Sequence, residues 1–117
     1  MKSVYRYLLV TLFFTFYSSP LLAEKNDFDI VCQYFEKLDQ EPNQKTMTYL
    51  ERNDYILQLI QSHLSEVSNA RGAWEAISNA EPSSRYYLFK SAAESVINKP
   101  WSCSAMEKLA PNTGEFE

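Results

Sequence analysis

The chain has 117 residues, 45% of them hydrophobic, and a formal net charge of −4 at pH 7. An acidic chain without clustered Lys and Arg is a poor match for nucleic-acid phosphates, so nucleic acid is not an expected partner. Two glycines in the whole chain and few long β-branched runs argue against a sheet-rich fold.

The first residues have the three-part pattern of a secretory signal peptide. Lys2 and Arg6 precede an apolar run over 7–17, which breaks at a Ser-Ser-Pro sequence. A helix that crosses the membrane needs about 20 apolar residues, so we expect cleavage after Ala23 and no stable membrane insertion afterwards. Cleavage changes the net charge from −4 to −6, because two basic residues and no acidic residue are removed.

The sequence therefore predicts three parts. These are a signal peptide over 1–23, one helical domain over 24–110 and a flexible tail over 111–117. The expected location is the periplasm or the exterior of the cell.

Apolar residues at helical spacing predict the first two helices. The first has Asp27 as its expected N-cap and ends before Pro42. The second begins at Thr48, which has capping-box spacing to Glu51, and is expected to continue to about Ser68.

Three further helical segments are expected over about 70–77, 82–97 and 102–109. Asn98 is expected to end the middle one in a left-handed conformation. The apolar stripe predicted for that helix consists of Tyr86, Phe89, Ala93 and Val96. The fold class is thus all-α, a small single-domain bundle or array of four to five helices.

The two cysteines, Cys32 and Cys103, have one possible intramolecular pairing. Neither lies in a CxxC motif, so a structural disulfide is favoured over reactive thiols or a bridge between chains. The bond would tie the first helix to the last and stabilise the domain by about 4 kcal/mol on the chain-entropy model. Trp101 is expected to pack over the sulfur.

The helix over 48–68 has an apolar arc of about 220°, more than the roughly 100° that a one-sided contact needs. Either this helix runs through the middle of the array, or the surplus forms a dimer interface, a groove for a client peptide or a cavity wall. The side chains expected on this extra surface are Tyr34, Tyr55, Leu59 and Tyr87.

His63 is the only histidine, so no catalytic triad or histidine metal cluster can form around a second one. It lies on the shoulder of the apolar arc, where we expect a half-buried residue that could sense pH if it lies in an interface. Met47 and Met106 follow no copper-binding spacing, and the carboxylate pairs have ordinary surface spacing. No enzyme activity and no cofactor are expected.

Ion pairs at i,i+4 spacing are expected between Arg71 and Glu75 and between Glu81 and Arg85.

In gross plan, a small exported helical domain with one disulfide resembles the periplasmic acid-stress chaperones. The resemblance is one of architecture and implies chaperone-like binding of other proteins. The leading hypothesis is a non-enzymatic periplasmic interaction or chaperone-like protein, a homodimer or bound to another envelope protein. The alternatives are a carrier of a small apolar ligand or lipid, with its cavity between the first, second and fourth helices, and a secreted inhibitor or effector.

Overall fold

The computed structural model describes residues 26–113, and within that range every regular element is helical. The elements are α2 (Asp27–Asp39), η1 (Gln44–Thr46), α3 (Tyr49–His63), α4 (Asn69–Ile77), η2 (Pro82–Ser84), α5 (Arg85–Ile97), α6 (Ser104–Leu109) and η3 (Ala110–Asn112). The predicted all-α class is confirmed. The predicted signal peptide and residues 114–117 of the predicted tail lie outside the described residues.

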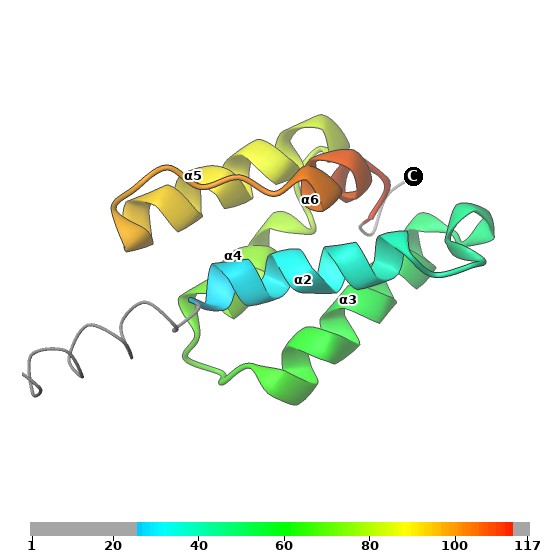
Figure 1. Cartoon of the computed structure of the whole chain (residues 1–117), viewed down its shortest axis with the longest axis horizontal. Coiled ribbons are helices and arrows are strands. Elements are labelled where there is room, and N and C mark those ends of the chain that lie inside the picture. Colours follow the sequence, from blue (N-terminus) through cyan, green and yellow to red (C-terminus); the bar gives the residue numbers. More distant parts are fainter. Residues whose placement is uncertain (1–25, 114–117) are drawn as a thin grey trace, which may run out of the picture.

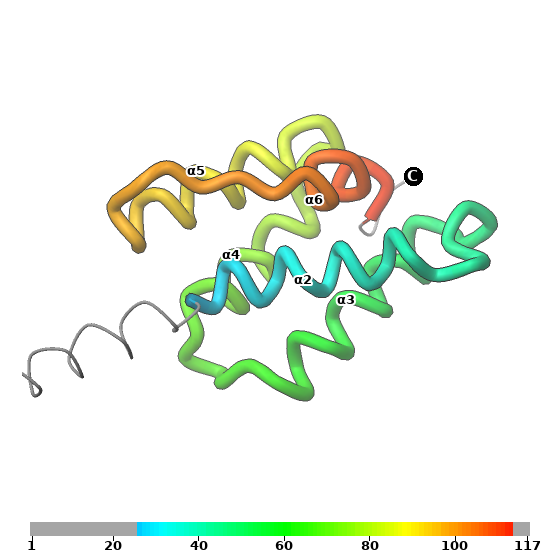
Figure 2. The backbone as a smooth tube through the Cα atoms, in the orientation of Figure 1, coloured from blue at the N-terminus to red at the C-terminus, as the bar shows by residue number. Residues whose placement is uncertain are grey.

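Helix α2 is the central element. It contacts α3, α4 and α6, while α5 packs on α4 and α6. Figure 1 shows α2 between α3 on one side and the α5–α6 segment on the other, and the backbone tube in Figure 2 follows the same order. The expectation that the second predicted helix, now α3, runs through the middle of the array was therefore wrong.

The N-terminus of α2 is capped one residue earlier than predicted. The side-chain oxygen of Asn26 accepts a hydrogen bond of 2.9 Å from the backbone N–H of Asp29, so Asp27 is the first helical residue instead of the cap. In α3 the predicted capping box is confirmed, because Thr48 and Glu51 bond to each other's backbone N–H groups at 3.1 and 2.8 Å.

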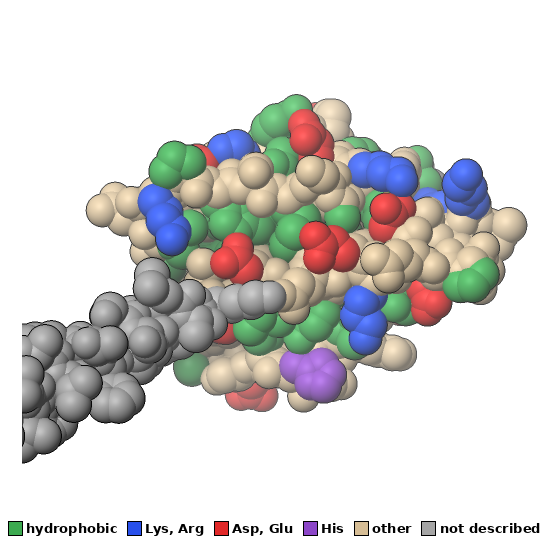
Figure 3. Space-filling view, viewed as in Figure 1, with side chains coloured by type: hydrophobic (Ala, Val, Ile, Leu, Met, Phe, Trp, Pro, Cys, Tyr) green, Lys and Arg blue, Asp and Glu red, His purple; other side chains and the backbone are tan. Residues whose placement is uncertain are grey.

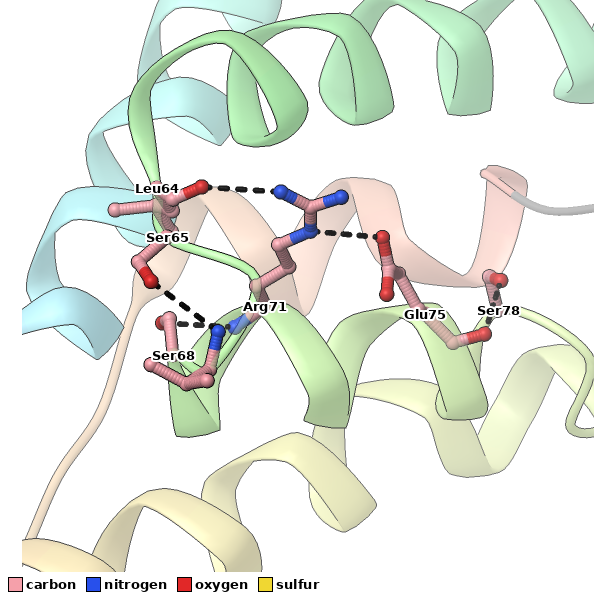
Figure 4. A network of polar contacts seen from close by, with 7 residues as sticks. Leu64, Ser65, Ser68, Arg71, Glu75 and Ser78 are labelled. Carbon is pink, nitrogen blue, oxygen red and sulfur yellow. Dashed lines mark hydrogen bonds and ion pairs between the residues drawn. The ribbon is translucent and has the colours of Figure 1, made fainter.

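Helix α3 ends at His63, five residues before the end that the sequence predicted. Leu64 is extended, and its carbonyl accepts a hydrogen bond of 3.1 Å from the guanidinium of Arg71 in the next helix (Figure 4). The hydroxyl of Ser68 accepts one of 3.2 Å from the backbone N–H of Arg71 and begins α4. The helical spacing of apolar residues continues past the end of α3, because Leu64 lies outside the helix but is buried in the core.

Three aromatic rings from three helices form the centre of the core. Trp74 of α4 lies between Phe35 of α2 and Phe89 of α5, with ring centroids 5.1 and 6.1 Å apart. All three side chains are fully buried, and each contributes about 1.5–3 kcal/mol or more through burial. This cluster joins the central helix to α4 and α5.

The predicted disulfide is confirmed. Cys32 of α2 bonds to Cys103, which precedes α6, with Cα atoms 5.8 Å apart. Nearby, the indole N–H of Trp101 donates to the carboxylate of Asp29 at 2.9 Å, and its ring packs against Phe89. Both ties attach the segment after α5 to the central helix.

Two buried arginines hold the C-terminal segment. Arg85 donates to the carbonyls of Ala80, Ala110 and Thr113 at 3.0, 3.4 and 2.7 Å, in place of the predicted pair with Glu81. Burial lowers the pKa of this guanidinium, although a nearby tyrosine opposes the change.

Arg52 of α3 donates to the carbonyl of Asn112 at 3.2 Å, next to Thr113, whose side chain is buried. The packed domain therefore extends to Thr113, three residues beyond the boundary predicted at 110.

Candidate functional site

The five side chains predicted for an interaction surface do not share one face. Tyr34 is buried at 8% exposure, Tyr55 and Leu59 are half-buried, and His63 and Tyr87 are exposed. The first four belong to α2 and α3, whereas Tyr87 belongs to α5, on the other side of α2 (Figure 1).

Tyr34 and His63 are brought together, with ring centroids 6.2 Å apart. Burial, and then the charge of Asp27, raise the pKa of the Tyr34 phenol, so this ring stays neutral under ordinary conditions. His63 itself lies on the open surface of α3 (Figure 3, purple). Its role as a pH sensor remains a prediction.

Tyr55 and Leu59 largely serve the domain itself, because both pack against its core. The Tyr55 hydroxyl donates to the carboxylate of Glu41 at 3.5 Å, and burial followed by that carboxylate raises the pKa of the phenol. These contacts leave little of the predicted surface on α3 free.

Three of the five large hydrophobic side chains that are exposed between residues 26 and 113 lie on α5. Tyr87, Leu88 and Val96 are 59%, 45% and 51% exposed. Val96 was predicted to face the core with Tyr86, Phe89 and Ala93, and that was wrong for Val96 alone. At about 100° per residue, Val96 lies about 20° from Phe89, in the last turn of the helix, whereas Tyr87 and Leu88 lie on the opposite side from the core.

We call this side the α5 outer face. Its members share one property, the absence of charge, and are Tyr87, Leu88, Ser91, Ala92 and Ser95. They span an arc of about 140° on a helix about 20 Å long. The face is therefore a continuous neutral strip on an acidic molecule.

The charged residues in the body of α5 lie on its flank and pair with each other. Lys90 donates to the carboxylate of Glu94, which also accepts a hydrogen bond of 2.9 Å from the backbone N–H of Trp101. These two contacts, in that order, lower the pKa of the Glu94 carboxyl. The pair holds both charges off the α5 outer face.

A hollow opens beside Val96, at the C-terminal end of α5. It has a volume of about 130 Å³ and lies between the start of α2, the start of α4 and the end of α5. Its lining includes Phe28, Ala70 and Ile97. The hollow therefore lies on the side of α5 that faces α2 and α4, and not on the α5 outer face.

Between residues 26 and 113 no cluster of three or more His, Cys, Asp or Glu side chains is arranged to hold a metal ion. No helix in the same range is long and apolar enough to cross a membrane. Figure 3 shows hydrophobic side chains in the seam between α2 and the α5–α6 segment, with acidic side chains beside them.

No protein-family model matches the chain, and no curated protein or solved structure matches it either.

Sequence reasoning named Tyr87 but missed the rest of the α5 outer face. The signal was present: Leu88 and Ala92, and beside them Tyr87, Ser91 and Ser95, repeat at i,i+4 spacing without a charge.

Proposed function

We propose that this chain is an exported, chaperone-like protein that binds apolar segments of other proteins through the α5 outer face. The observation that carries the proposal is the exposure of Tyr87 and Leu88 on one uncharged side of a single helix. Contiguous exposed apolar area marks interaction sites on soluble proteins. A helix face of about 20 Å fits an apolar segment of about four turns.

Export is supported by two features. The N-terminal residues have the signal-peptide pattern, and the Cys32–Cys103 disulfide is of the kind that persists in oxidising compartments. In such a compartment the net negative charge favours the solubility of the protein. The neutral strip is then the place where another protein can be bound.

The carrier alternative receives less support. It expects a ligand cavity between α2, α3 and α5, but the rings of Phe35, Trp74 and Phe89 fill the centre of the domain. The hollow beside Val96 opens at the surface, at one end of α5. Its position suits a protruding side chain better than an enclosed ligand.

The test is suppression of client aggregation by the protein recovered after secretion. Rhodanese diluted from denaturant supplies an aggregating client without heat or reductant, so the disulfide stays intact. We expect the wild-type protein to reduce light scattering at least twofold and Leu88→Glu to abolish this effect, since a buried charge disfavours the bound state.

The matched control is Leu50→Glu. Leu50 of α3 is 52% exposed, close to the 45% of Leu88, and lies on another helix. It should keep the wild-type effect. A wild-type protein without any effect on scattering would overturn the proposal, as would equal losses in both variants.

A further inference from the structure

Arg85 is a fully buried cation with one nitrogen atom that lacks a partner among residues 26–113. Its Nε and Nη1 atoms donate to the carbonyls of Ala80, Ala110 and Thr113, whereas Nη2 makes no hydrogen bond within the described part of the chain. A guanidinium stays protonated in proteins, so these N–H groups belong to a charge that has been removed from water. Such a group needs an acceptor, and a carboxylate suits it best.

A second buried arginine adds to the positive charge of this region. Arg52 of α3 is 8% exposed and donates to the carbonyl of Asn112, one residue before the carbonyl of Thr113 that Arg85 binds. Tyr49 lies close to both guanidinium groups. Neither arginine takes part in an ion pair between residues 26 and 113. Two cations therefore converge on the end of η3 without a carboxylate from that part of the chain.

The backbone carbonyls do not replace a carboxylate partner for Arg85. A carbonyl is a dipole without net charge, so three of them stabilise the cation but leave its charge unpaired. Burial accordingly lowers the pKa of the guanidinium, although Tyr49 opposes the change. A carboxylate on Nη2 would satisfy the orphaned N–H groups and pair the charge at the same time.

The residues that follow Thr113 include the nearest carboxylates in sequence. The chain continues with the residues GEFE, so Glu115 comes two residues after the carbonyl that Arg85 binds. Two residues span at most about 7 Å, a distance that a glutamate side chain can largely recover by pointing back. The intervening Gly114 can adopt left-handed conformations, which makes a turn back toward α5 possible.

We propose that Arg85 is a carboxylate-binding site and that Glu115 of the same chain occupies it, with a carboxylate oxygen accepting from Nη2. The guanidinium has no exposed surface, so a free anion cannot reach it without an opening of the structure. A tethered carboxylate has a high effective concentration at the site whenever the C-terminal segment folds onto the domain. The ion pair would fasten the chain beyond Thr113 to α5.

This inference is separate from the proposed function. Arg85 and Phe89 lie on the same side of α5 and are buried, whereas Tyr87 and Leu88 lie on the opposite side. Glu115→Gln should therefore leave the suppression of rhodanese aggregation unchanged. A protein that fails in the rhodanese assay can still have the carboxylate site, and a protein without the site can still bind a client.

The first test is the folding equilibrium of Glu115→Gln in the disulfide-bonded protein, measured by urea denaturation. We expect the equilibrium constant for folding to fall about tenfold or more, because the variant loses a charged hydrogen bond to a buried donor. The matched control is Glu117→Gln, which changes the net charge equally and should stay within about twofold of the wild type. Equal losses in the two variants, or no loss in Glu115→Gln, would overturn the proposal.

Added acetate distinguishes a free carboxylate from Glu115. If Glu115 fills the site, sodium acetate should stabilise the wild type no more than sodium chloride does at the same ionic strength. A specific stabilisation of the wild type by acetate would mean that the site is open to anions from solution, and the assignment to Glu115 would be wrong.

A second measurement observes the guanidinium directly. In the ¹⁵N-labelled protein, the Nη2 signals of Arg85 report the hydrogen bonds of this group independently of stability. We expect these signals to shift in Glu115→Gln and to keep their positions in Glu117→Gln. Unchanged backbone amide signals of Trp74 and Phe89 verify that both variants are folded. Arg85 signals that do not respond to Glu115→Gln would overturn the proposal, even if that variant were less stable.

Discussion

Helices α3 and α5 both carry more apolar residues than their core contacts use, yet they expose them differently. On α3, Tyr55, Leu57 and Leu59 pack against the edge of the core, and exposed Leu50 stands among charged neighbours. On α5, the exposed apolar residues form a strip without charge. The width of an apolar arc therefore does not locate a binding surface, whereas the distribution of charge on the exposed side does.

The largest expected difference in stability is between substitutions on the buried side and on the exposed side of α5. Phe89, which contacts the rings of Phe28, Trp74 and Trp101, is fully buried, and Phe89→Ala should cost about 3–5 kcal/mol of unfolding free energy. Leu88→Ala, one residue away on the outer face, should change the stability of the monomer by less than about 0.5 kcal/mol. Urea denaturation at low protein concentration measures both.

A large loss of monomer stability in Leu88→Ala would mean that this side chain serves the core. The distinction between the two sides of α5 would then fail.

The disulfide belongs to the inner side of the molecule, where it ties α2 to the start of α6. The double variant Cys32→Ala, Cys103→Ala should lose about 4 kcal/mol, because the bond closes a loop across a sequence separation of 71 residues. Denaturant titration of the variant and of the oxidised wild type gives the difference. A loss below about 1 kcal/mol would mean that the contacts around Trp101 already hold α6 in place.

The indole of Trp101 makes the second tie to α2. Trp101→Phe keeps the packing against Phe89 but removes the hydrogen bond to Asp29, and should cost about 1.5 kcal/mol. A double-mutant cycle with Asp29→Ala isolates the pairwise interaction. A coupling energy near zero would show that the hydrogen bond does not stabilise the fold.

The smallest expected effect concerns the flank of α5. Because the hydrogen bonds from Lys90 and from the backbone N–H of Trp101 lower the pKa of Glu94, the carboxylate contributes stability above its unfolded-state pKa. That contribution is lost as the pH falls through the lower folded-state pKa. NMR titration of the Glu94 carboxyl measures this pKa, and Lys90→Met should raise it toward the ordinary value.

An unchanged pKa in Lys90→Met would mean that Lys90 does not hold the charge of Glu94. The neutrality of the α5 outer face would then need another explanation.

Much of the fold follows from local patterns. The capping box at Thr48, the left-handed Asn98 and the disulfide were predicted, because each depends on a short sequence signal or on the count of cysteines. The end of α3 and the packed C-terminal segment were not. Both depend on arginines, Arg71 and Arg85, that bond to carbonyls distant in sequence or across a turn.

The candidate site was harder to predict than the fold. A helical arc tells which residues share a side, but the tertiary arrangement decides which side is covered. For α5, the contacts with α4 and α6 cover the side of Phe89 and leave Tyr87 and Leu88 exposed. The long-range neighbours of a helix cannot be derived from its own periodicity.

The most direct test of the central claim is NMR of the ¹⁵N-labelled protein mixed with unfolded, unlabelled rhodanese. If the α5 outer face binds protein, the amide signals of Tyr87, Leu88 and Ser91 will broaden, while that of Leu50 on α3 will stay sharp. Broadening centred on α3 and His63, or spread evenly over the domain, would contradict the assignment of the binding surface to α5.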